Sequence, residues 1–139
     1  MPYKFLEDIA TADIAFEARG RTLDELFENA FAAVEESMVE TSGVKAVVKK
    51  TLKLKNATLD GLLFDFLSAL VYFKDAESLL FSKVKVKITD SYELEATLYG
   101  EKIDPSRHDL RSDVKAVTLH MFEVKQVGKE WYCRVILDI

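Results

Sequence analysis

Apolar residues recur at spacings of three and four in two segments, which is the period of a helix that buries one face. The first segment follows Thr22-Leu23-Asp24-Glu25, a capping box, and carries Leu23, Leu26, Phe27, Ala30, Phe31, Val34 and Met38. The second begins at Thr58 or Leu59 and has a wider apolar surface, formed by Leu62, Leu63, Phe66, Leu67, Leu70 and Val71. The pattern therefore predicts two helices, of which the second is the more central.

Three glutamates lie near the carboxyl end of the first predicted helix, namely Glu35, Glu36 and Glu40. The helix dipole disfavours negative charge at that end. We therefore expect the end to be exposed, with a solvated face as the first explanation and a basic partner as the alternative.

Alternation of apolar and polar residues predicts strands in the rest of the chain, at residues 10–18, 51–55, 83–88, 92–99, 114–124 and 131–137. Val127-Gly128-Lys129 is a predicted hairpin turn. The lysines that alternate within 51–55 and 83–88 are interpreted as solvated faces or as guards against edge pairing. The order of elements predicts an α+β fold for the single domain 1–139. In it, two main helices pack in two layers on a largely antiparallel sheet, with a mixed sheet as the alternative.

Composition fits a soluble globular protein, with 49% hydrophobic and 31% charged residues. The lone cysteine, Cys133, shares a strand face with apolar residues, so core packing explains it better than a functional thiol. We expect a reducing compartment, the cytoplasm, with no secretory signal and no membrane span. A net charge of −5 argues against strong direct binding of nucleic acid, so any role in RNA biology should act through a protein partner.

Candidate chemistry lies at the carboxyl end, where Asp138 and Ile139 place a side-chain carboxylate beside the terminal one. Calcium and magnesium take several oxygen ligands, above all carboxylates. Asp13 alternates with Ile14 and Phe16, so its side chain should point away from the core and could supply a third carboxylate. Acidic residues near strand ends are also commonly just solvated, so spacing alone leaves both interpretations open.

Enzymatic motifs are not evident. The polar loop between Tyr99 and Val114 contains His108 and either carries function or only connects. His108 and His120 lack the ligand spacing of a zinc site, and no phosphate loop, nucleophile elbow or Cys-x-x-Cys pair occurs. The sequence predicts no catalytic residues and no organic cofactor.

An ordered set of short motifs resembles the archease family over nearly the whole chain. Among them are Thr11-Ala12-Asp13-Ile14, residues 20–30, Leu62-Leu63-Phe64-Asp65-Phe66-Leu67, Tyr99-Gly100-Glu101, Asp104-Pro105-Ser106-Arg107-His108, Val114-Lys115-Ala116-Val117-Thr118 and the closing residues 135–139. The resemblance implies a non-enzymatic activator of RtcB-type RNA ligases, which promotes GTP-dependent guanylylation of the ligase histidine and multiple turnover in tRNA splicing. It also implies a metal site for calcium, with magnesium or manganese as alternatives, formed by Asp13, Asp138 and Ile139.

One departure from the family pattern concerns the segment before Asp13. Many members read Leu-Glu-His-Thr-Ala-Asp, whereas here Asp8-Ile9-Ala10 stands between Glu7 and Thr11, so the histidine is absent. This affects the surroundings of the site more than its ligands.

A general chaperone or interaction module for RNA-modifying enzymes, such as tRNA methyltransferases, is the second functional hypothesis. A metal hydrolase is the third and is disfavoured, because no base or nucleophile accompanies the carboxylates.

Overall fold

The computed structural model describes residues 2–6 and 13–139, and it confirms both predicted helices. They are α1 (Leu23–Met38) and α2 (Leu59–Glu77), and the short 3-10 helix η1 (Thr41–Gly43) follows α1. Each long helix begins at a threonine cap: the hydroxyl of Thr22 accepts from the amide of Glu25, and that of Thr58 accepts from Gly61, both at 3.1 Å. The Glu25 carboxylate accepts in return from the amide of Arg21, at 3.2 Å, rather than from the cap residue itself.

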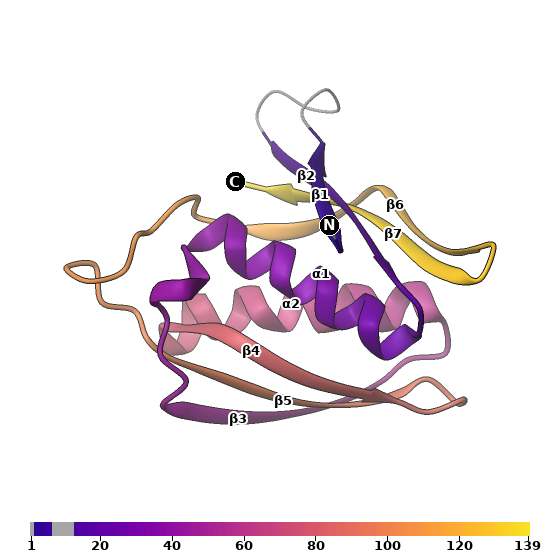
Figure 1. The fold of residues 1–139 in the computed structure, drawn as a ribbon, viewed down its shortest axis with the longest axis horizontal. Coiled ribbons are helices and arrows are strands. Elements are labelled where there is room, and N and C mark those ends of the chain that lie inside the picture. The colour runs from indigo at the N-terminus through magenta and orange to yellow at the C-terminus, as the bar shows by residue number, and fades with distance from the viewer. Residues whose placement is uncertain (1, 7–12) are drawn as a thin grey trace.

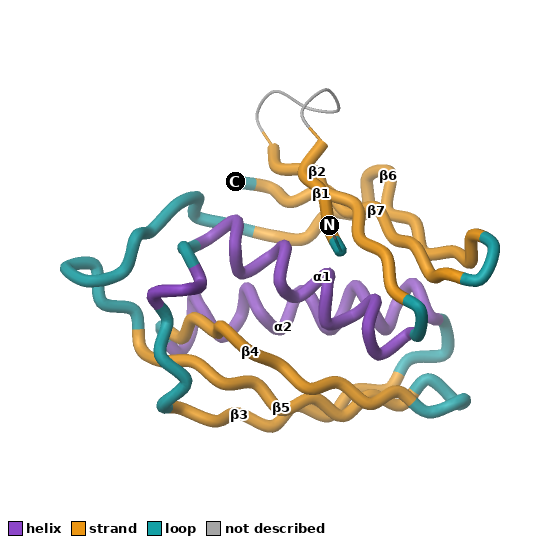
Figure 2. Tube along the Cα trace, in the orientation of Figure 1, coloured by secondary structure: helices purple, strands orange, loops and turns teal. Residues whose placement is uncertain are grey.

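The described strands form two antiparallel sheets. One has the order β1 (Tyr3–Leu6), β2 (Asp13–Gly20), β7 (Glu130–Asp138), β6 (Ala116–Val127), and the other β3 (Val48–Lys55), β5 (Glu93–Lys102), β4 (Leu79–Ile88). The α+β class is confirmed, but the strands separate into two sheets where the sequence predicted one. Figure 1 shows the two long helices between the sheets, and Figure 2 shows the long loop that joins β5 to β6.

The core lies where the helices meet both sheets. Helix α1 contacts β2 on one side and β4 on the other, and α2 contacts β6, β4 and β3. The largest fully buried side chains include Phe16, Phe27, Phe66 and Phe81. Cys133 is also fully buried, and burial raises the pKa of its thiol to about 12, which confirms its place in the core. In the described part of the chain, neither helix is long and apolar enough to span a membrane.

The prediction that the carboxyl end of α1 is exposed is wrong for Glu35, which is fully buried. Its Oε1 accepts a hydrogen bond from the amide of Phe81 at 2.9 Å, because this face of α1 packs against β4. Glu36 is half-buried, and its basic partner is Arg111 of the same chain, at 2.9 Å. Only Glu40 is exposed as expected.

Helix α1 also covers the free edge of β4 with carboxylates. Besides Glu35, Asp24 accepts from the amide of Ile88 at 2.9 Å and Glu28 accepts from the amide of Val86 at 3.0 Å. An edge strand presents unpaired amides that invite pairing with other chains. The acidic positions of α1 satisfy these amides within the fold.

We predict that Glu28→Ala lowers the free energy of unfolding by about 1–2 kcal/mol, because the Val86 amide loses its acceptor. Glu28→Gln removes the same charge but keeps an acceptor oxygen, so it should retain most of the stability. Urea unfolding of the two variants measures the difference. Equal stability of both would show that the hydrogen bond contributes nothing measurable.

Candidate functional site

The pairing of β2 with β7 brings two of the predicted metal ligands together. Asp13 lies directly opposite Asp138 in the antiparallel register, and Ile14 lies opposite Leu137. Directly opposite residues project from the same face of a sheet, with Cβ atoms about 4.5–5.5 Å apart. Phe16 and Ala18 are buried and Glu17 is half-buried, as the predicted alternation requires, but Ala15 is buried as well, and Asp13 and Ile14 are both half-buried.

The third predicted ligand, Ile139, follows Asp138 directly and is exposed. The carbonyl of Asp138 accepts a hydrogen bond from the amide of Lys115 at 2.8 Å, so the end of β7 is held against the segment that leads into β6. Asp138 itself is exposed. At the end of the four-stranded sheet, Asp138 and Ile139 are therefore exposed beside the half-buried Asp13.

The donor set suits a hard divalent cation, because two side-chain carboxylates and a terminal carboxylate supply only oxygen ligands. Within residues 2–6 and 13–139, no three His, Cys, Asp or Glu side chains are grouped to hold a metal ion. A site at this position therefore depends on the main-chain carboxylate of Ile139 as its third ligand. The metal site at Asp13, Asp138 and Ile139 stays a prediction.

A hollow of about 400 Å³ lies beside Asp13. Apolar residues of β1 and β2 form one part of it, and polar residues from two other segments form the rest, namely Glu36, Ser37, Arg111 and Ser112. No pattern in the sequence indicates these polar neighbours, because Arg111 and Glu36 are brought together only by the fold. Thr11 and the Asp8-Ile9-Ala10 segment lie outside the described residues.

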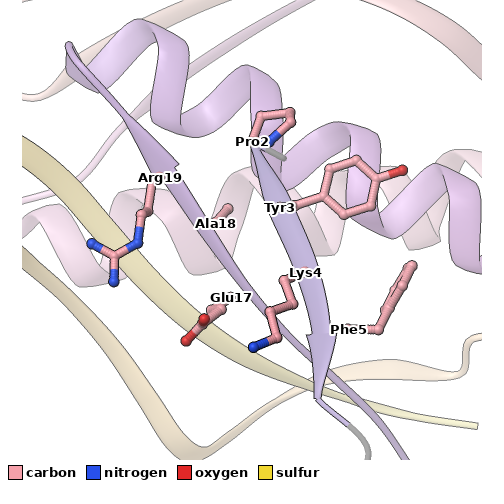
Figure 3. A pocket seen from close by; sticks show the side chains of 7 residues that line it. All are labelled: Pro2, Tyr3, Lys4, Phe5, Glu17, Ala18 and Arg19. Atoms are coloured by element: carbon pink, nitrogen blue, oxygen red, sulfur yellow. The ribbon is translucent and has the colours of Figure 1, made fainter.

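A second hollow, of about 450 Å³, lies on the β1–β2 hairpin (Figure 3). Lys4 stands opposite Glu17 in the strand register, and Glu17 also accepts a hydrogen bond from the hydroxyl of Tyr132 at 2.9 Å. The guanidinium of Arg19 lies over the Tyr132 ring, 5.0 Å from its centre. Glu17 and Arg19 thus both contact Tyr132 within the sheet, and the residues that line this hollow offer no nucleophile with an adjacent base.

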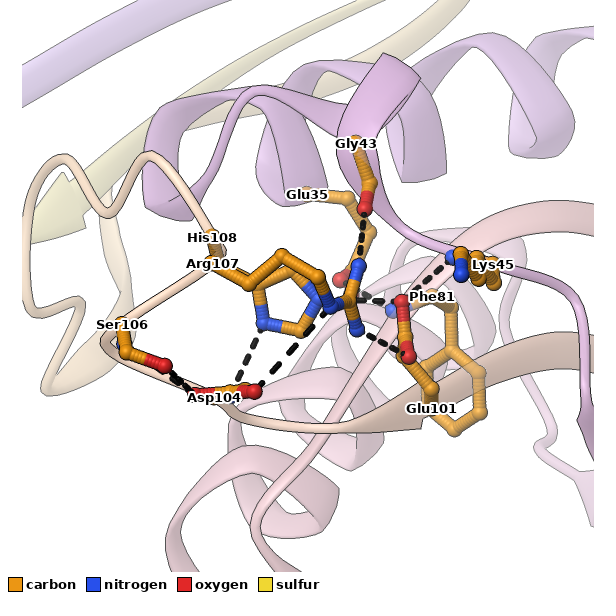
Figure 4. A network of polar contacts seen from close by, with 9 residues as sticks. All are labelled: Glu35, Gly43, Lys45, Phe81, Glu101, Asp104, Ser106, Arg107 and His108. Carbon is orange, nitrogen blue, oxygen red and sulfur yellow. Dashed lines mark hydrogen bonds and ion pairs between the residues drawn. The ribbon is translucent and has the colours of Figure 1, made fainter.

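The polar loop after β5 is held by a network centred on Glu101 (Figure 4). Glu101 accepts from the amide of Lys45 at 2.5 Å, lies 3.0 Å from Nε2 of His108, and pairs with Arg107. The Lys45 amide, then His108 and Arg107, lower the pKa of Glu101 to about 2. Nδ1 of His108 accepts from the amide of Asp104 at 2.9 Å, so the ring proton lies on Nε2 and donates to Glu101.

This network assigns His108 a structural task, because its side chain is buried and both ring nitrogens are engaged inside the loop. His120 is exposed on β6. Of the two readings of the loop, connection is the one its contacts support. The candidate site is therefore the carboxylate end of the four-stranded sheet.

Comparison with known proteins gives concordant results. A model of the family described as "Archease protein family (MTH1598/TM1083)" matches residues 3–139. The protein archease of Sulfurisphaera tokodaii is 38% identical over 138 residues, which cover 99% of this chain and 98% of that protein. The protein archease of Methanothermobacter thermautotrophicus is 42% identical over 132 residues, covering 93% of this chain and 94% of that protein.

Two solved structures share the fold. The solution structure of Methanobacterium thermoautotrophicum protein 1598 has a TM-score of 0.82 and 36% identity, and the match covers 99% of both chains. A crystal structure from Thermotoga maritima, described as an archease and possible chaperone, has a TM-score of 0.70 and covers 94% of this chain and 93% of that one. At 21% identity, the second likeness bears on the fold alone.

Proposed function

The chain belongs to the archease family, and we propose that it activates an RtcB-type RNA ligase in tRNA splicing and RNA repair. It would promote GTP-dependent guanylylation of the ligase histidine, and so sustain multiple turnover in the cytoplasm, without catalysing a reaction itself. The observation that carries the proposal is the register that sets Asp13 opposite Asp138, next to the terminal residue. These three residues are the ligand set that the family resemblance assigns.

In this proposal Asp13, Asp138 and the carboxylate of Ile139 would hold a divalent cation, calcium first, with magnesium or manganese as alternatives. A divalent cation offsets phosphate charge in nucleotidyl transfer. The contribution of this chain is to hold three oxygen groups at an exposed sheet end, where a ligase could approach them. The carboxylates have one of two roles. They either act at the nucleotide pocket of the ligase, or they form a structural clasp that only holds β2 against β7.

The strand pairing favours action at the ligase over a clasp. The β2–β7 ladder runs along the whole of β2, from Asp13 opposite Asp138 to Gly20 opposite Trp131. Since this ladder already joins the two strands, a clasp at one end would add little.

We predict that Asp13→Asn or Asp138→Asn reduces the stimulation of the cognate ligase by at least about tenfold, because each removes a charged ligand. The measurements are guanylylation and multiple-turnover ligation, with calcium binding followed by calorimetry. Glu17→Gln is the matched control, since it removes a carboxylate from the same strand and face, and it should keep full stimulation.

Thermal unfolding of the same variants separates the two roles of the carboxylates. Action at the ligase predicts folded variants with near-normal stability and no stimulation. Loss of stability in step with stimulation would instead support the clasp. If the wild type itself fails to stimulate a cognate ligase, the activator proposal is wrong.

The second candidate function is a chaperone or interaction module for RNA-modifying enzymes such as tRNA methyltransferases. It is favoured by the description of the Thermotoga maritima protein as a possible chaperone. The discriminating property is selectivity. An activator needs GTP and acts at stoichiometric or lower amounts on one ligase, whereas a chaperone suppresses the aggregation of unrelated clients.

A further inference from the structure

The three-stranded sheet presents one face to the helices and the other to solvent (Figure 1). The strand register places residues of the outer face in rows across β3, β5 and β4: Lys49, Tyr99 and Lys83 form one row, Thr51, Thr97 and Lys85 the next, and Lys53, Glu95 and Lys87 the third. Lys55 and Glu93 complete the face. We call this surface the lysine face.

Charge on the molecule is strongly segregated. The lysine face carries six exposed lysines and two exposed glutamates, a formal charge of +4, although the whole chain carries −5. Among the described residues, none of these six lysines lies within 4.0 Å of a carboxylate. The net charge of the chain is therefore a poor guide to this surface, and its lysines are free to meet a polyanion.

Protection of sheet edges does not account for the lysines of β4. Lysine on an edge strand discourages pairing with other chains, and that reading suits β3, which is an open edge. The edge of β4 is instead covered by α1, whose carboxylates accept from the amides of Phe81, Val86 and Ile88. For Lys83, Lys85 and Lys87 this leaves a solvated face or a surface that meets a polyanion.

Two further features of the face point to the chemistry of its partner. Tyr99 is half-buried on the central strand, between Lys49 and Lys83 of the neighbouring strands. At the other end, Lys53, Lys55 and Lys87 line a hollow of about 560 Å³ together with Glu93 and Glu95, so the excess of positive charge is greatest beside Tyr99. An aromatic ring among lysines on a sheet is the arrangement that binds single-stranded nucleic acid, through base stacking and phosphate contacts.

We propose that the lysine face binds single-stranded RNA, with Lys49, Lys83 and Lys85 on the phosphates and Tyr99 stacked on a base. An acidic polypeptide would satisfy the lysines equally well, but it would make no use of the tyrosine. The inference goes beyond the activator function and does not rest on it, because it concerns a different surface and is testable without a ligase.

The experiment measures fluorescence anisotropy of a labelled oligouridylate with the whole chain at several salt concentrations. We expect binding at low salt that weakens as salt rises, with a log–log slope of about −0.7 for each phosphate contact. Lys83→Gln/Lys85→Gln should weaken binding at least about tenfold and make the slope shallower by about 1.4. Lys115→Gln/Lys129→Gln, which removes two exposed lysines that adjoin the other sheet, should leave binding unchanged.

Tyr99→Leu should weaken oligouridylate binding about fivefold or more without changing the salt slope, because stacking is not electrostatic. Tyr72→Leu, a change of an exposed tyrosine on α2, is its control and should have no effect. The proposal is overturned if oligouridylate does not bind at low salt, or if the Lys115/Lys129 control weakens binding as much. If poly-glutamate binds as tightly as oligouridylate and Tyr99→Leu does not weaken either interaction, the proposal is overturned in favour of an acidic protein partner.

Discussion

Gly100→Ala is expected to lower the free energy of unfolding by at least about 3 kcal/mol, because no room exists for a methyl group at this position. A Cβ there would lie 1.9 Å from the carbonyl oxygen of Leu80 and 2.7 Å from Cα of Phe81. Both are main-chain atoms, so a side-chain rotation cannot relieve the clash. Strand β4 would have to move away from β5.

The position matters because β4 changes register against β5 at this point. Gly100 pairs with Phe81, and the register shifts between Phe81 and Lys83. The same glycine is paired with Val48 of β3 and precedes Glu101, the centre of the loop network. Displacement of β4 here would disturb the pairing of β5 with β3 and with β4. It would also disturb the hydrogen bond from the Phe81 amide to Glu35.

Gly43→Ala is the matched control, since a Cβ at Gly43 would meet nothing within 4 Å and the carbonyl that accepts from Arg107 is kept. Its stability should stay within about 0.5 kcal/mol of the wild type or rise slightly. Urea unfolding of both variants measures the difference. A Gly100→Ala protein as stable as the control would mean that the register shift absorbs the methyl group.

The helices could be predicted from the sequence because their signals are local. Thr22 and Thr58 cap the helices through residues three positions away, and the apolar stripes need only the helical period. In β3 and for most of β5, alternation likewise indicated which side of the strand is buried. It does not indicate which strand lies beside which, so one sheet was predicted where two form. The four-residue strand β1 is too short for a repeated alternation to be recognised, and it was not predicted.

The candidate site was predictable in part for the same reason. The pattern put Asp13 on the polar side of the strand predicted at 10–18 and Asp138 directly after the strand predicted at 131–137, and the family resemblance joined them. The contacts of Glu36 with Arg111 and of His108 with Glu101 depend on how the loop after β5 packs against the helices and strands. The spacing of apolar residues carries no information about this packing. Glu35 was assigned to solvent because helix rules consider the dipole but not a neighbouring strand with free amides.

Glu35 should make the protein less stable as the pH rises from 5 to 8. Burial raises its pKa from 4.5 to about 8, against smaller opposing effects of the Phe81 amide and Lys74. The unfolded chain loses this proton near pH 4.5, whereas the folded chain keeps it. Below that pH the free energy of unfolding is therefore not reduced by Glu35. It declines by roughly 1.4 kcal/mol per pH unit until the folded group ionises near pH 8.

Glu35→Gln should remove this decline, because the amide stays neutral and its oxygen can still accept from Phe81. The amide nitrogen takes the place of Oε2, which has no hydrogen-bond partner among the described residues, so the two proteins should be similar near pH 5. At pH 8 the variant should be the more stable by several kcal/mol, as measured by urea unfolding at each pH. Glu36→Gln, one residue along, should keep the wild-type slope. If the free energy of unfolding of the wild type and of Glu35→Gln changed with pH in parallel, Glu35 would already be ionised in the folded protein.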